Sequence, residues 1–191
     1  MAPRLILTGF MATGKSAVAR AMARRLAWPL FDCDAAVVAR ARMPIAEIFR
    51  THGEAFFRTL EREVIAALAA AAPRCPQCGE IRPAVIATGG GAIVDPVNYE
   101  ALARAGVIIC LTARPEVIVR RLGRSIRSRP MLTQGGKSVR ERVAELLEAR
   151  RAAYGRAAIT IDTSNLDIDQ VVETIIDRVA ALTSEGCRLS A

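Results

Sequence analysis

The sequence predicts an α/β fold in which a five-stranded parallel sheet carries helices on both faces. Short apolar segments alternate with segments of helical periodicity, and these apolar segments lack the polar alternation of a strand with one solvated face. Composition agrees, since 52% of the residues are hydrophobic but only 4% aromatic, which requires an aliphatic core. A chain of 191 residues fits one domain, 1–191.

The elements follow in regular order along the chain. We expect strands over residues 4–8, 30–33, 84–88, 107–111 and 158–162. Periodicity predicts helices over 16–26, 35–42, 45–51, 54–71, 97–104, 115–122, 138–152 and 167–182. Prolines and glycines predict irregular segments over 73–83 and 123–137, and we expect the tail, 184–191, to be disordered.

Charge and cysteine content restrict the class of protein. The formal net charge of +8 favours anionic partners such as phosphate metabolites, carboxylates or nucleic acid. No run of about 18 apolar residues predicts a membrane span, and the first residues lack the pattern of a signal peptide. Five scattered cysteines fit a reducing compartment better than a disulfide framework. We therefore expect a cytoplasmic protein.

The segment GFMATGKS, residues 9–16, matches the phosphate-binding pattern G-x-x-x-x-G-K-[ST]. It lies between the first expected strand and the first expected helix, so loop amides and the helix N-terminus converge on an anion. Lys15, one of only two lysines among 27 lysine and arginine residues, would contact the β- and γ-phosphates, and the Ser16 hydroxyl would ligate Mg²⁺. A glycine turn before an ordinary helix is the alternative. The nucleotide-binding candidates are Gly9, Ala12, Thr13, Gly14, Lys15, Ser16 and Ala17.

Two aspartates follow the second expected strand. Asp32 and Asp34 would share a face of that strand, at the sheet edge where ligands bind in open parallel sheets. One could hold Mg²⁺ through water, and the other could accept a proton from a substrate hydroxyl. The alternative is that Asp34 merely caps the helix that begins near Ala35.

An arginine and three glycines complete the candidate site. Arg58 lies on a predicted helix between Glu54 and Glu61, which share its face and could hold its guanidinium; ordinary ion pairs on a solvated face are the alternative. The glycine triplet 89–91 follows the third strand. It would let a small polar substrate approach the backbone closely, or it forms a tight turn.

The ordered set of motifs resembles the shikimate kinase family over about residues 4–182. The resemblance rests on the loop 9–16, FDCD at 31–34, GEAFFR at 53–58, TGGGA at 88–92, RPML at 129–132 and EARRAAY at 148–154. It implies a three-layer P-loop NTPase fold with a substrate-binding helical region over about 35–62 and a mobile lid over about 123–137.

The same resemblance implies the activity. ATP and Mg²⁺ would be the cofactors, and the chain would phosphorylate the 3-hydroxyl of shikimate, giving shikimate 3-phosphate and ADP in aromatic amino acid biosynthesis. It would act as a monomer, without nucleic acid or membrane partners.

The resemblance also implies roles for single residues. The residues that would bind shikimate are Asp34, Arg58, Gly89, Gly90, Gly91 and Arg150, the first of them also acting as the base. The catalytic set would be Lys15, Asp34 and Arg129. Ser16 would ligate Mg²⁺, with Asp32 contributing through water. Arg129 would reach the phosphates from the lid, and Arg121 would lie near the adenine, together with the loop after Asp162.

The chain departs from the family pattern at several positions. Ala12 stands where the family usually has a third loop glycine, and its methyl group would be strained only in a left-handed conformation. Ala152 and Ala153 replace a Pro-Leu pair, which loosens a rigid turn near Arg150. Asn165 and Leu166 lie where relatives often carry arginine, and we assign no adenine contact there.

Two features leave other interpretations open. The insertion CPQCG at 75–79 looks like half of a zinc knuckle; we expect a surface loop, with a metal shared between two chains or a redox pair as alternatives. Six arginines between 114 and 129 could instead bind nucleic acid phosphates, which would indicate a nucleic-acid-dependent ATPase. A kinase for gluconate or a nucleoside monophosphate is the third possibility.

Overall fold

The computed structural model describes residues 4–71, 82–123, 132 and 137–188. At its centre lies a sheet of five parallel strands in the order β2-β3-β1-β4-β5. The strands are β1 (Arg4–Gly9), β2 (Leu30–Asp32), β3 (Ala84–Ala87), β4 (Val107–Thr112) and β5 (Ile159–Asp162). The predicted parallel sheet is confirmed, and each strand boundary lies within one residue of its expected position.

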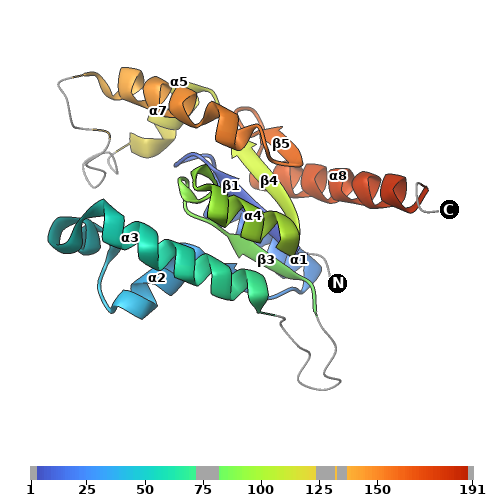
Figure 1. The fold of residues 1–191 in the computed structure, drawn as a ribbon. Coiled ribbons are helices and arrows are strands. Elements are labelled where there is room, and N and C mark those ends of the chain that lie inside the picture. Colours follow the sequence, from blue (N-terminus) through green and yellow to red (C-terminus); the bar gives the residue numbers. More distant parts are fainter. Residues whose placement is uncertain (1–3, 72–81, 124–131, 133–136, 189–191) are drawn as a thin grey trace.

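Helices cover both faces of the sheet, which gives the three predicted layers (Figure 1). One face is covered by α1 (Lys15–Leu26) and α8 (Ile168–Arg188). The other face is covered by α2 (Cys33–Ala41), α3 (Ile45–Ala70), α4 (Pro96–Ala105), α5 (Pro115–Leu122) and α7 (Val139–Tyr154). A short 3₁₀ helix that the sequence did not predict, η1 (Ala92–Val94), follows the glycine triplet.

The core is aliphatic and divided by the sheet. In β1, Leu5 and Leu7 pack against α1 and α8, whereas Ile6 between them packs into the cluster that contains α3 and α4. All three side chains are buried, as expected for a central strand whose successive residues point to opposite faces. This packing fixes β1, and with it the loop that follows the strand.

Two helices differ from their predicted bounds, and a third prediction is confirmed. α2 begins at Cys33 rather than near Ala35, because the Asp32 side chain caps it. The two helices expected over 45–51 and 54–71 are confirmed as two segments of α3, which are separated by non-helical backbone at Gly53 (φ 80°, ψ 175°). α8 continues to Arg188, beyond the end expected at 182, and disorder of the tail remains a prediction. No proline interrupts that stretch, and a single glycine costs a helix only about 1 kcal/mol.

Some predictions lie outside the described residues. These include Arg129, both cysteines of the 73–83 insertion and nearly all of the predicted lid. Leu132 is described, and it is fully buried in the core cluster of α5 and α7. Within the described part of the chain, no helix combines the length and apolar character that a membrane span requires.

Candidate active site

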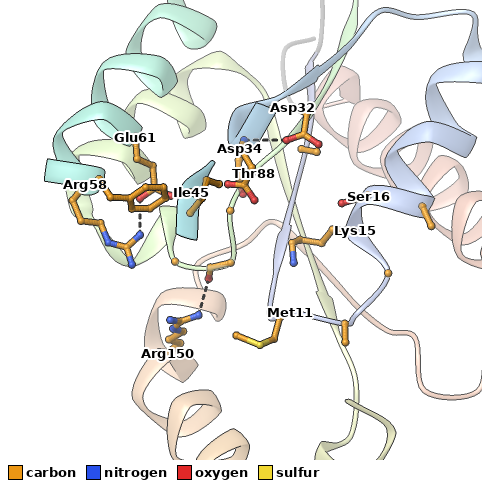
Figure 2. Close-up of a pocket in the computed structure, with 18 of the residues that line it drawn as sticks. Met11, Lys15, Ser16, Asp32, Asp34, Ile45, Arg58, Glu61, Thr88 and Arg150 are labelled. Carbon is orange, nitrogen blue, oxygen red and sulfur yellow. Dashed lines mark hydrogen bonds and ion pairs between the residues drawn. The ribbon is translucent and has the colours of Figure 1, made fainter. Parts of the chain in front are cut away.

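A cavity of about 530 Å³ lies at the carboxyl ends of β1, β2 and β3 (Figure 2). Parallel strands present these ends at one edge of the sheet, so segments that are distant in the sequence meet there. The predicted residues that line the cavity are Ala12, Gly14, Lys15, Ser16, Ala17, Asp32, Asp34, Arg58, Gly89, Gly90, Gly91 and Arg150. The structure therefore brings together nearly all of the described candidate residues.

The loop after β1 is closed around one carbonyl group. Thr13 Oγ1 donates a hydrogen bond to the Phe10 carbonyl oxygen at 2.7 Å, and Lys15 Nζ donates to the same oxygen at 2.8 Å. Gly9 does not line the cavity, and its glycine is required by packing: a Cβ there would lie 2.1 Å from the Leu111 carbonyl oxygen. Gly14 caps α1 with φ 97°, a left-handed conformation that glycine adopts at low cost.

Ala12 has a left-handed backbone. Its φ is 61°, so this departure from the family pattern places a methyl group in the conformation that glycine favours. The loop therefore keeps its shape at the expense of local strain. Ala12 also lines the cavity, so the strain lies directly at the phosphate-binding candidate.

The two aspartates have separate roles in the local structure. Asp32 caps α2, because its Oδ1 accepts hydrogen bonds from the backbone N–H groups of Asp34 and Ala35 at 3.0 and 3.2 Å. The alternative in which Asp34 caps the helix is therefore wrong. Asp34 lies in the first turn of α2, and both carboxylates line the cavity (Figure 2).

Arg58 is held by two carboxylates, as its spacing predicts. Its Nη1 donates to Glu61 at 2.7 Å, and its Nε and Nη2 donate to Glu54 at 3.2 and 3.0 Å. Glu61 is only 2% exposed, which excludes an ordinary solvated helix face. The guanidinium also lies 5.2 Å from the centre of the Phe57 ring. Arg58 thus has a fixed orientation at the cavity wall.

The two glutamates keep the Arg58 guanidinium charged despite its burial. Burial lowers the pKa of Arg58, but the hydrogen bonds and charges of Glu61 and Glu54 outweigh this effect, and the pKa is raised overall. Burial raises the pKa of Glu61 above its ordinary value of 4.5, and the charge of Asp34 adds to the shift, against the opposing effect of Arg58. Burial therefore disfavours the ionised form of Glu61, and the neighbouring Arg58 offsets part of that cost.

Each glycine of the triplet has a side chain of the site against it. A Cβ on Gly89 would lie 3.0 Å from Asp34 and Glu61 oxygens, and one on Gly91 would lie 3.0 Å from both terminal nitrogens of Arg58. At Gly90 the neighbour is the Gly9 carbonyl oxygen at 3.0 Å, with Arg150 Nη1 at 3.7 Å. Close approach, rather than a tight turn alone, therefore explains the triplet.

Arg150 reaches the triplet from α7. Its Nη1 donates to the Gly90 carbonyl oxygen at 3.3 Å, and its guanidinium lies 5.6 Å from the centre of the Phe10 ring. Ala152 and Ala153 continue the helix to Tyr154, so the missing Pro-Leu pair does not turn Arg150 away from the cavity. Tyr154 Oη donates to the same carbonyl oxygen at 2.7 Å. Tyr154 had no predicted role, although it lies one helical turn after Arg150.

A second cavity of about 610 Å³ lies on the other side of the phosphate-binding loop, lined by Thr13, Gly14 and Ala17. Arg121 also lines it, held by Thr163: its Nη1 donates to Oγ1 at 2.9 Å and its Nη2 to the carbonyl oxygen at 2.6 Å. Leu166 borders this cavity, although we assigned no contact there. The two cavities adjoin through the loop, since Gly14 and Ala17 line both.

Two further observations on the described residues concern a buried thiol and the ligands available for a metal ion. Burial, with the charges of Asp34 and Asp32, raises the pKa of Cys33 to about 12, which makes its thiol a poor nucleophile. Among the described residues, no group of three or more His, Cys, Asp and Glu side chains gathers to hold a metal ion. A cation here would take most of its ligands from phosphates and water, as Mg²⁺ commonly does.

Known proteins of one family match this chain. The family model described as "Shikimate kinase" matches residues 11–180. A shikimate kinase of Geobacter sulfurreducens is 42% identical over 171 residues, which cover 90% of this chain and 87% of that protein. One of Thermoanaerobacter pseudethanolicus is 38% identical over 172 residues, which cover 90% and 93%.

Solved structures agree with these matches. Shikimate kinase from Acinetobacter baumannii in complex with shikimate superposes with a TM-score of 0.82 at 28% identity, covering 95% of this chain and 94% of that chain. A gluconokinase from Sinorhizobium meliloti reaches a TM-score of 0.57 at 15% identity, covering 99% and 98%. That second likeness shows only that the fold is shared.

Proposed function

Since the chain belongs to the shikimate kinase family, we propose that it transfers the γ-phosphoryl group of ATP to the 3-hydroxyl of shikimate, giving shikimate 3-phosphate and ADP. One observation carries the proposal beyond family membership. Asp34, Arg150 and Arg58 each lie within 4 Å of a Cβ position on the glycine triplet, beside a phosphate-binding loop. A candidate base, Asp34, and two candidate carboxylate-binding residues, Arg58 and Arg150, therefore surround the glycine backbone that would contact the substrate.

The charges of the cavity fit shikimate, which has one carboxylate and three hydroxyls. Arg58 and Arg150 bind the carboxylate, because a guanidinium offers paired donors in the geometry of a carboxylate. The N–H groups of the glycine triplet bind hydroxyls. Asp34 accepts the proton of the attacking hydroxyl and orients it toward the phosphates at Lys15.

The nucleotide side is assigned to the loop and the second cavity. The loop amides and Lys15 bind the phosphates, and the adenine lies toward Arg121. Mg²⁺ fits the donor set: the Ser16 hydroxyl would be a direct ligand, and Asp32 would act through water. Both helix-capping bonds of Asp32 use Oδ1, which leaves Oδ2 for a metal-bound water. The ion supplies charge neutralisation for the transferring group.

Further assignments rest on the family likeness. Arg129 meets the phosphates from the lid, and closure of the lid excludes water. The protein acts as a monomer in the cytoplasm, without nucleic acid or membrane partners. These assignments concern residues outside the described part of the chain or properties of the protein in the cell.

The test is an assay of ADP release from ATP and Mg²⁺ with four acceptors in parallel. We expect release with shikimate and not with gluconate, a nucleoside monophosphate or single-stranded DNA. Release stimulated by DNA but not by shikimate would reject the kinase assignment and favour the arginine-rich segment as a binding surface. Release with gluconate alone would reject the substrate while retaining the kinase chemistry.

A further inference from the structure

The carbonyl group of Gly90 accepts hydrogen bonds from two side chains of α7. Tyr154 Oη donates to it at 2.7 Å and Arg150 Nη1 at 3.3 Å, so the tyrosine makes the closer bond. Tyr154 is 6% exposed and belongs to the core cluster that also contains Phe10 and Val143. Its hydroxyl is thus a rigidly placed donor beneath the cavity floor, while Arg150 lines the cavity itself.

This bond fixes the orientation of one peptide group. The peptide between Gly90 and Gly91 is planar, so a carbonyl directed at α7 directs the Gly91 N–H to the opposite side. Figure 2 shows Arg150 on one side of the glycine loop and Asp34 on the other. Within the described part of the chain, neither the Gly90 nor the Gly91 N–H donates a hydrogen bond. These donors remain for a ligand.

Glycine alone does not hold such an orientation. Without a Cβ, the residues on both sides of this peptide have a wide choice of φ and ψ, and the peptide can turn over. Arg150 is an unreliable anchor, because the proposed function requires its guanidinium for the carboxylate of shikimate. Tyr154 also interacts with the Arg150 side chain, but it has no task at the carboxylate, and burial raises its pKa, which keeps the phenol protonated and able to donate.

We propose that Tyr154 is a positioning residue for shikimate: its hydroxyl holds the Gly90 carbonyl so that the Gly91 N–H stays directed at the substrate when Arg150 turns to the carboxylate. Tyr154 acts through the backbone and does not touch the substrate. The inference rests on the proposed function, and it assigns the substrate floor to α7, the helix that follows the lid in the chain.

The test replaces the hydroxyl and keeps the ring, with Tyr154→Phe. We expect the KM for shikimate to rise about tenfold, a change of about 1.4 kcal/mol, while the KM for ATP stays unchanged. Shikimate affinity measured by calorimetry without ATP should fall by the same factor. Tyr99→Phe is the matched control, since Tyr99 Oη also donates to a backbone carbonyl, that of Arg156 at 3.1 Å, away from the cavity.

The outcomes separate the two proposals. Wild-type protein without shikimate-dependent ADP release would reject the proposed function itself. If the wild type is active and Tyr154→Phe loses thermal stability while keeping the wild-type KM for shikimate, the tyrosine is only structural and the inference is overturned. Equal increases in the KM values for shikimate and ATP would overturn it as well, because a general distortion of the site would then explain the loss.

Discussion

A Cβ on Gly91 would lie 3.0 Å from both terminal guanidinium nitrogens of Arg58. The glycine floor and the proposed carboxylate anchor are therefore in direct contact. Gly91 has φ −101° and ψ −6°, a backbone that any residue adopts, so packing against Arg58 is what requires glycine at this position. A substitution at Gly91 can therefore shift the guanidinium of Arg58 while the arginine itself is retained.

We expect Gly91→Ala to displace Arg58 and leave the fold intact, because the neighbour that must move is the end of a long side chain. The guanidinium must give by a few tenths of an ångström, so the KM for shikimate should rise by up to about tenfold, below the roughly 100-fold loss that a 1 Å misplacement can cause. Steady-state kinetics with ATP held saturating measure this change. In an Arg58→Ala background the same substitution should add little, and full additivity would contradict the assigned contact.

Glu61→Gln should change stability in a pH-dependent way. Burial raises the folded-state pKa of Glu61 above its ordinary value of 4.5, so the folded state binds this proton more tightly than the unfolded state does. The stability that the glutamate contributes relative to glutamine should therefore fall as pH rises through and above 4.5. Urea unfolding of both proteins between pH 4.5 and 7.5 measures the difference. A difference that grows with pH would refute the assignment.

Glu54→Gln is the control for that experiment. Glu54 also pairs with Arg58 but is 62% exposed, so its loss should change the free energy of unfolding by less than about 1 kcal/mol. Glu61 is buried and makes the shorter bond to Arg58, so Glu61→Gln should raise the KM for shikimate more than Glu54→Gln does.

The sequence predicted the sheet and most of the residues that meet at the cavity, because short apolar strands and short-range motifs are local signals. The spacing of Glu54, Arg58 and Glu61 was sufficient to predict their ion pairs. It could not distinguish which aspartate caps α2, since Asp34 directly precedes the start expected near Ala35, whereas the helix begins at Cys33, directly after Asp32. That choice depends on where β2 ends, and a strand boundary is set by pairing with β3.

Two other features depend on tertiary structure. The role of Tyr154 depends on α7 reaching the loop after β3, a contact across 64 positions of sequence that no local pattern encodes. The left-handed backbone of Ala12 was stated only as a condition, because alanine itself favours right-handed conformations. The structure of the loop overrides that local preference.

Ala12→Gly should stabilise the protein. A left-handed conformation costs a non-glycine residue about 1–2 kcal/mol, and glycine removes this cost. Glycine also increases the conformational entropy of the unfolded chain, which offsets part of the gain in stability. We expect the free energy of unfolding to rise by about 0.5–1 kcal/mol and Tm by about 2 °C. Ala23→Gly, inside α1, is the opposite control and should cost about 1 kcal/mol. Thermal and urea unfolding of both variants measure these changes. A lower stability of Ala12→Gly than of the wild type would show that the Ala12 backbone is not strained.

Lys15→Met should abolish most turnover and leave the fold intact. Removing one preorganised charge from a transferring phosphoryl group costs about 10²- to 10³-fold in kcat. The other lysine, Lys137, provides a matched control, since it pairs with Glu145 on α7 and does not line the cavity. Lys137→Met should keep wild-type kcat. Equal losses in the two variants would remove the special role of Lys15.

Asp34→Asn should act chiefly on kcat, because the amide keeps the shape of the side chain but cannot accept the proton of the attacking hydroxyl. A general base contributes about 10²- to 10⁴-fold, and the loss would fall toward the lower end if the transition state is loose and needs little proton removal. The KM for ATP should stay unchanged, since Asp34 lies in the first turn of α2 against Gly89, on the substrate side of the cavity. Pre-steady-state phosphoryl transfer, measured by rapid quench, isolates this step from product release. A transfer rate equal to that of the wild type would leave Asp34 as a binding group and would assign the proton to solvent.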